Sequence, residues 1–152
     1  MGDILLVHYN IDPISYLIRW YTHSYWNHCA WILNDCALIE SKRTGILVSS
    51  INRYDNKFLF KTKAIKIKNL TYKQKRIIAM YLIKSCTKKT SYLSHIWSFL
   101  LILCHFKGNT SKKTCSGLLA HAFAQIGRIF CHKPLDFVTP ADIAQSTEVY
   151  YD

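Results

Sequence analysis

Short apolar runs separated by polar residues dominate the first seventy positions of the chain. Runs of roughly four to eight residues suit buried strands better than helices. The predicted strands cover Ile4 to His8, Trp26 to Leu33, Ala37 to Ser41 and Ile46 to Val48. Asn34 and Asp35 tolerate the positive φ angles of a tight turn, so the second and third runs are predicted to form a hairpin. Between the first two runs, Pro13 opens a predicted helix that continues to about His23 with Asp12 as its cap.

The pattern changes in the second half of the chain. Lys61 to Ile67 still alternates basic and apolar residues, which predicts an edge strand with one face in water. After Thr71 the apolar positions recur at helical spacing, at Ile77, Ile78, Tyr81, Leu82 and Cys86. Further helices are predicted from Tyr92 to about His105, from Cys115 to near Gly127, and from Pro140 onwards, where Thr139 is the cap. Strands first and helices later indicate a single α+β domain over residues 1–152.

The charge of the chain is unevenly spread. The formal net charge is +11, and residues 56–135 contain sixteen Lys and Arg but no Asp or Glu. Such a region attracts an anionic lipid surface or an acidic protein, although an ordinary solvated surface explains it equally well. No recognised motif for sequence-specific nucleic-acid binding accompanies the basic residues. A salt-dependent gel shift would separate non-specific phosphate binding from a solvated surface.

Six cysteines stand in apolar surroundings without C-x-x-C spacing. This usage favours free thiols in a reducing compartment. No signal peptide is recognised, and the apolar segment 96–104 is too short to cross a bilayer. The expected location is therefore the cytoplasm, or the host cytoplasm if the source is a virus.

Cys115 stands where a basic loop becomes an apolar helix. Thr114 can cap that helix, so Cys115 would belong to its first turn. The backbone N–H groups there, together with Lys112 and Lys113, lower the pKa of a thiol and suit a nucleophile. The alternative interpretation is a small buried cysteine of an ordinary core helix.

His28 is the best placed of the seven histidines to act as a base for this thiol. It lies within a predicted strand between Trp26 and Trp31, so packing would hold its ring. In the predicted hairpin, His28 and Glu40 fall on the same face about one diagonal step apart, which lets the carboxylate orient the imidazole. Taken alone, each has a simpler interpretation: a core histidine bonded to a carbonyl, and a strand-end carboxylate in water.

Five motifs occur in a recognisable order along the chain. They are Gly2-Asp3, Trp26-Asn27-His28-Cys29-Ala30, Ile39-Glu40-Ser41 followed by Gly45 and Val48, Thr114-Cys115-Ser116-Gly117-Leu118, and Thr139-Pro140-Ala141-Asp142. In this order they resemble the permuted branch of the NlpC family of papain-like cysteine hydrolases, which includes YiiX-type proteins, poxviral relatives and the lecithin:retinol acyltransferase group. The resemblance covers nearly the whole chain. Its pattern departs at Gly117, where YiiX-type proteins usually carry an acidic residue, and after Tyr92, where an acid is missing.

The resemblance implies a circularly permuted papain-like fold, with an antiparallel sheet or small barrel packed against helices that include the nucleophile helix. It implies a catalytic triad of Cys115, His28 and Glu40 that hydrolyses a peptide, amide, thioester or other acyl substrate and needs no cofactor. We assign the oxyanion and pocket positions to Ser116, Tyr9, His8 and Tyr92. A second histidine at position 40 and a membrane-spanning tail, both found in acyltransferase relatives, are absent from this sequence, which disfavours lipid acyl transfer.

Three rival functions remain open from the sequence. A metal site would use ligands among His28, Cys29, Cys36, Cys131 and His132, but their spacing lacks the paired ligands of structural zinc. A binding protein would use the basic region for nucleic acid or anionic lipid. A relative of the same fold could act on lipids as an acyltransferase or phospholipase, or bind a partner in the cleft without catalysis.

Overall fold

A computed structural model describes residues 2–11, 13–42, 44–86 and 114–151, apart from the side chain of Ile14. Its strands are β1 (Ile4–Tyr9), β2 (His28–Ile32), β3 (Ala37–Lys42), β4 (Gly45–Ser50), β5 (Phe60–Ile67) and β6 (Val149–Tyr150). Its α-helices are α1 (Pro13–Thr22), α2 (Tyr72–Ser85), α4 (Cys115–Ala124) and α5 (Pro140–Ala144), with short 3-10 turns η1 (Ile51–Tyr54) and η2 (Leu135–Phe137). The predicted helix from Tyr92 to His105 lies outside the described residues.

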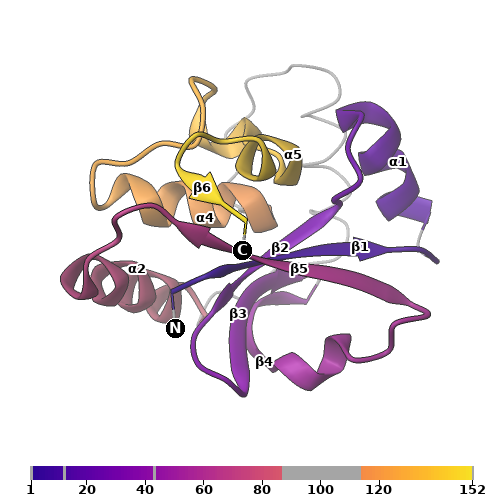
Figure 1. Cartoon of the computed structure of the whole chain (residues 1–152), viewed down its shortest axis with the longest axis horizontal. Helices are drawn as coiled ribbons and strands as arrows, with labels where there is room; N and C mark the ends of the chain where they lie inside the picture. The colour runs from indigo at the N-terminus through magenta and orange to yellow at the C-terminus, as the bar shows by residue number, and fades with distance from the viewer. Residues whose placement is uncertain (1, 12, 43, 87–113, 152) are drawn as a thin grey trace.

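The six described strands form one open antiparallel sheet in the order β4-β3-β2-β1-β5-β6. The α+β class is confirmed, and the sheet, rather than a closed barrel, is the arrangement present. The permuted order of the fold stays a prediction. Figure 1 shows α2, α4 and α5 gathered beside the sheet, whereas α1 follows the far end of β1.

The prediction that Lys61 to Ile67 forms an edge strand is wrong for the C-terminal end of this segment, which has a neighbour on both sides. β5 pairs with β1 along its length, but Lys66 and Ile67 also pair with Tyr150 and Val149 of β6. Two residues of strand leave almost no periodic signal in a sequence, so β6 was not expected. The outer edge of the sheet is therefore covered for part of its length by the end of the chain.

Strand alternation divides the core into two layers. The larger layer joins Leu6, Cys29, Trp31 and Ile39 of the sheet to the helices, and it contains most of the buried side chains of α4. Trp31 meets Phe123 of α4 edge-on, with ring centroids 5.9 Å apart. The smaller layer joins Leu5, Val7, Ala30, Leu38 and Tyr54 on the other face. Because side chains alternate along a strand, Glu40 shares the parity of Leu38 and belongs with the smaller layer.

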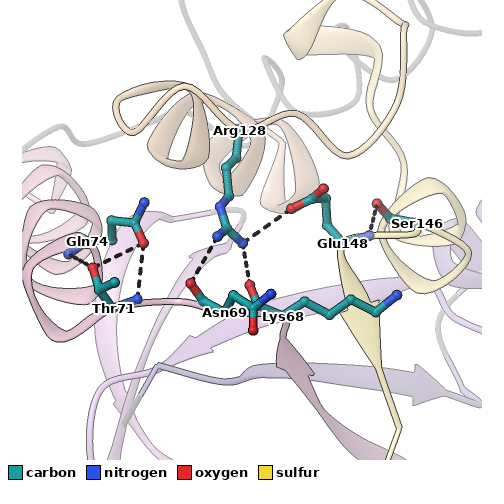
Figure 2. A network of polar contacts seen from close by, with 7 residues as sticks. All are labelled: Lys68, Asn69, Thr71, Gln74, Arg128, Ser146 and Glu148. Carbon is teal, nitrogen blue, oxygen red and sulfur yellow. Dashed lines mark hydrogen bonds and ion pairs between the residues drawn. The ribbon is translucent and has the colours of Figure 1, made fainter.

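Arg128 adds to the β5–β6 pairing that joins the C-terminal segment to the sheet. Arg128 donates hydrogen bonds to the carbonyl oxygens of Lys68 (2.5 Å) and Asn69 (3.0 Å) and contacts Glu148 at 3.3 Å. Figure 2 shows Arg128 reaching from the loop after α4 to the end of β5 and to the residue before β6. We call this group of four residues the arginine clamp. It joins three segments that are distant in the sequence.

Candidate functional site

Cys115 is the first residue of α4, as the sequence predicts. Thr114 is the N-cap: its backbone is extended, and its Oγ1 accepts a hydrogen bond from Gly117 N at 3.0 Å. Buried Leu118, Leu119 and Phe123 hold the helix against the sheet. Cys115 itself is partly exposed. The fold thus presents a thiol at a helix start, where the unpaired backbone N–H groups favour negative charge.

The Thr114 cap also explains why position 117 is a glycine. A Cβ atom at position 117 would lie 2.9 Å from Thr114 Oγ1 and 3.4 Å from the carbonyl oxygen of Leu135 in η2. Any larger side chain would press on the cap that defines the helix start. The glycine therefore keeps the helix start tightly packed against η2.

His28 is the first residue of β2, directly opposite Val7 of β1. Its Nε2 is 2.9 Å from Glu40 Oε2, so the contact predicted from hairpin parity is present. The ring also lies beside the Cys115 thiol, close enough for each group to shift the pKa of the other. Since Nε2 is bonded to Glu40, Nδ1 is the nitrogen left for Cys115. The structure therefore brings Cys115, His28 and Glu40 together in one chain of contacts.

The charges of this chain stabilise one another. Burial acts to lower the pKa of His28, but the charge and hydrogen bonds of Cys115 and Glu40 outweigh it and raise the pKa to about 10. The hydrogen bond from the Cys29 thiol and the charge of His28 outweigh burial at Cys115 and hold its pKa well below the ordinary 9.0. Between these two pKa values the favoured state is a thiolate beside an imidazolium.

Cys29 also belongs to the site, and the sequence did not predict its contact with Cys115. It is buried, with 1 % of its surface exposed. Burial and the neighbouring Cys115 raise the pKa of its thiol well above the ordinary value. Cys29 therefore stays protonated, and its thiol and backbone N–H both act to lower the pKa of Cys115. Its place beside His28 in the sequence was the available signal.

Glu40 has two further partners that the sequence did not indicate. The Tyr54 hydroxyl donates to Glu40 Oε2 at 2.6 Å, and Lys42 Nζ is 2.5 Å from Oε1. The Glu40 side chain is 0 % exposed. Burial acts to raise its pKa, but the contacts with His28, Lys42 and Ser49 prevail and hold the pKa of this carboxyl far below its usual range. Glu40 is thus a fully buried carboxylate.

The remaining predicted site residues have other described contacts. The Ser116 hydroxyl is buried and donates to the Val138 carbonyl at 2.6 Å, so its side chain joins α4 to the segment before α5. The His8 ring stacks on Tyr25, and Tyr9 stacks on Phe60. Their roles at an oxyanion or pocket stay predictions. Tyr92 lies outside the described residues.

The candidate metal ligands do not converge. Across residues 2–11, 13–42, 44–86 and 114–151, no three His, Cys, Asp or Glu side chains lie together in a way that could hold a metal ion. Within the same ranges, no helix has the length and apolar character needed to cross a membrane.

Comparisons with known proteins find similarity among solved structures. No family model and no curated protein matches the chain. Among solved structures, it is similar to one described as the metalloprotein YiiX from Escherichia coli O157:H7, DUF1105. The TM-score is 0.71 at 13 % identity, over 98 % of this chain and 93 % of that chain. The fold is YiiX-like. At this identity the likeness concerns the fold, and it agrees with the family resemblance of the motifs.

Proposed function

We propose that the chain is a cysteine hydrolase that cleaves an amide, peptide or thioester bond through an acyl-enzyme intermediate. The observation that carries the proposal is the contact chain from Cys115 through His28 to Glu40. It links a thiol at a helix start to an imidazole, and the imidazole to a buried carboxylate. The YiiX-like fold supports the proposal because its family lies in the NlpC group of papain-like cysteine hydrolases.

In the first half of the reaction, the Cys115 thiolate attacks the substrate carbonyl carbon and forms a C–S bond. The carbonyl π electrons move to oxygen, and backbone N–H groups at the start of α4 stabilise that oxyanion. When the tetrahedral intermediate collapses, the imidazolium of His28 gives its proton to the leaving nitrogen or sulfur. The products are a thioester on Cys115, a neutral His28 and the free amine or thiol.

In the second half, His28 takes a proton from water as the water oxygen attacks the thioester carbonyl. Collapse breaks the C–S bond, releases the carboxylic acid and restores the thiolate beside the imidazolium. Glu40 accepts the Nε2–H of His28 throughout, which fixes the ring with Nδ1 toward the reacting atoms. The YiiX neighbour is described as a metalloprotein. Among the described residues of this chain, no group of three His, Cys, Asp or Glu side chains could hold a metal ion, and the steps above use side chains, backbone N–H groups and water.

The first experiment is a competition between cysteines. Iodoacetamide should label Cys115 first at pH 6 to 7, well before Cys36, because the pKa of Cys115 is lowered whereas Cys36 is merely exposed. Peptide mass spectrometry distinguishes the two sites. Equal labelling of several cysteines would contradict the proposal.

The second experiment measures turnover on a panel of amide, peptide and thioester substrates. Cys115→Ala should reduce kcat/KM on the order of 10³-fold or more, with Cys36→Ala as the matched control that retains full activity. A folded Cys115→Ala variant that keeps its activity would show that this cysteine is not the nucleophile. Circular dichroism confirms that each variant is folded.

A further inference from the structure

The carboxylate of Glu40 is unusually enclosed for the third member of a triad. Its side chain is 0 % exposed. Oε2 accepts hydrogen bonds from His28 and Tyr54, whereas Oε1 is compensated by an ion pair with Lys42. Desolvating a carboxylate costs several kcal/mol unless charged or hydrogen-bonding partners compensate it. His28 compensates it fully only while the ring is an imidazolium. The reaction proposed above makes that ring neutral for part of the cycle.

Lys42 supplies a charge that does not depend on the state of His28. It stands two residues after Glu40 on β3, so both side chains leave the same face of the strand. Its Nζ lies 2.5 Å from Glu40 Oε1 and also donates to Ser49 Oγ on β4 at 3.4 Å. The Lys42 side chain is 19 % exposed; burial lowers the pKa of its ammonium, and the facing Glu40 carboxylate acts to raise it.

Tyr54 fixes the other oxygen. It stands at the end of η1, beyond β4, and its hydroxyl donates to the same Oε2 atom that receives His28 Nε2. Burial and the Glu40 charge raise the pKa of Tyr54 well above its ordinary value, so the group remains a donor. Phe60 packs edge-on against its ring, and Lys42 Nζ lies 5.9 Å from the ring centroid. Neighbours therefore hold both donors in place.

We propose that Lys42 and Tyr54 are positioning residues that keep Glu40 ionised and hold Oε2 toward His28 throughout the reaction. Their contacts reach Cys115 through Glu40 and His28. The inference rests on the proposed function, because it assigns a purpose to the support of the triad. The group around Glu40 then contains the Cys115 thiolate, the His28 and Lys42 cations and the Glu40 carboxylate, and the charge of Arg53 in η1 also acts on Lys42 and Tyr54.

The test measures the reactivity of Cys115 without any substrate. Its rate of iodoacetamide alkylation is followed from pH 4 to 10 by peptide mass spectrometry. Removing the Lys42 cation makes the thiolate less favourable, so Lys42→Met should move the acid-side midpoint up by about one pH unit. Tyr54→Phe removes one donor and should move it in the same direction by about half a unit. Lys42→Arg retains the charge and should restore the parent profile.

Matched controls are available on α2. Lys73→Met and Tyr72→Phe make the same chemical changes at exposed positions and should leave the profile unchanged. If Lys42→Met does not fold, Tyr54→Phe decides the question, because it removes one oxygen and keeps the packed ring. If folded Tyr54→Phe and folded Lys42→Met both gave the same pH profile of alkylation as the parent, this inference would be overturned and the proposed function would stand. An ordinary thiol profile in the parent would contradict the proposed function as well.

Discussion

The network around Glu40 and the arginine clamp (Figure 2) are both built from ion pairs and hydrogen bonds, but their charges have different surroundings. The Glu40 side chain is 0 % exposed, whereas the paired side chains of Arg128 and Glu148 are 21 % and 36 % exposed. In the clamp, water screens the charges, and Arg128 donates two of its hydrogen bonds to backbone carbonyl oxygens. Burial therefore separates the network proposed to tune the reactivity of Cys115 from one that fastens segments together.

The type of charged group differs as well. Arginine stays protonated at any ordinary pH, so the clamp keeps the same charges through any catalytic cycle. The Glu40 network contains a histidine and a thiol whose pKa values are moved in opposite directions by their contact. Groups whose environments push their pKa values apart are typical of acid–base sites. The comparison thus predicts that the two networks respond to different experiments.

The largest expected difference between the two networks comes from Arg128→Met, which removes the clamp and keeps a long apolar side chain. Losing the hydrogen bonds to two carbonyls and the partly exposed pair with Glu148 should lower the free energy of unfolding by about 2 kcal/mol. Urea denaturation measures it, with Arg76→Met on the exposed face of α2 as the control. The pH profile of Cys115 alkylation should not move. A shifted profile would break the distinction between the two networks.

A second prediction concerns how stability depends on pH at the Cys115–His28 pair. The folded pKa of His28 is raised, so its contribution is complete below the ordinary 6.5 and lost as pH rises through about 10. The folded pKa of Cys115 is lowered, so its contribution is present above the ordinary 9.0 and lost as pH falls through the folded value. Between the two ordinary values, folding only moves one proton from sulfur to nitrogen. The combined contribution should therefore be constant in that window and fall on both sides of it.

The measurement is the difference in unfolding free energy between the parent and a Cys115→Ser, His28→Gln double variant, which removes both titrating groups. We expect a difference that is flat from about pH 6.5 to 9 and smaller by about 1 kcal/mol at pH 10. Taking the difference cancels the titration of the many other lysines and tyrosines. A difference that changes steadily across neutral pH would mean that the pair is not a thiolate and an imidazolium in the folded protein.

The parts of the site that could be predicted are those fixed by local geometry. Thr114 and the apolar residues after it define a helix start within one turn of Cys115, so the position of the thiol follows from a few neighbouring residues. The His28–Glu40 contact follows from the period of two in a strand and from a short hairpin. Both features depend on chain geometry that the sequence reports directly.

The parts that could not be predicted depend on segments that meet only in the folded chain. Tyr54 reaches Glu40 because η1 folds back over the smaller core layer after β4, and no local pattern records that turn. Cys29 meets Cys115 because α4 packs on β2, although a cysteine in an apolar strand looks like any core residue. Lys42 shares the parity of Glu40, which was a usable signal, but a strand-end lysine is usually read as solvated.

The smallest predicted effect tests the exposed border of the clamp. Thr71 and Gln74 form a capping box at the start of α2: Thr71 Oγ1 accepts from Gln74 N at 3.3 Å, and Gln74 Oε1 accepts from Thr71 N at 3.0 Å. Both bonds are exposed to water, so Thr71→Ala should cost roughly 0.5–1 kcal/mol of unfolding free energy. Thr71→Ser keeps the hydroxyl and is expected to stay near the parent in urea denaturation. Because this cap adjoins the clamp and not Glu40, a change in Cys115 reactivity on Thr71→Ala would show that the two networks are coupled through α2.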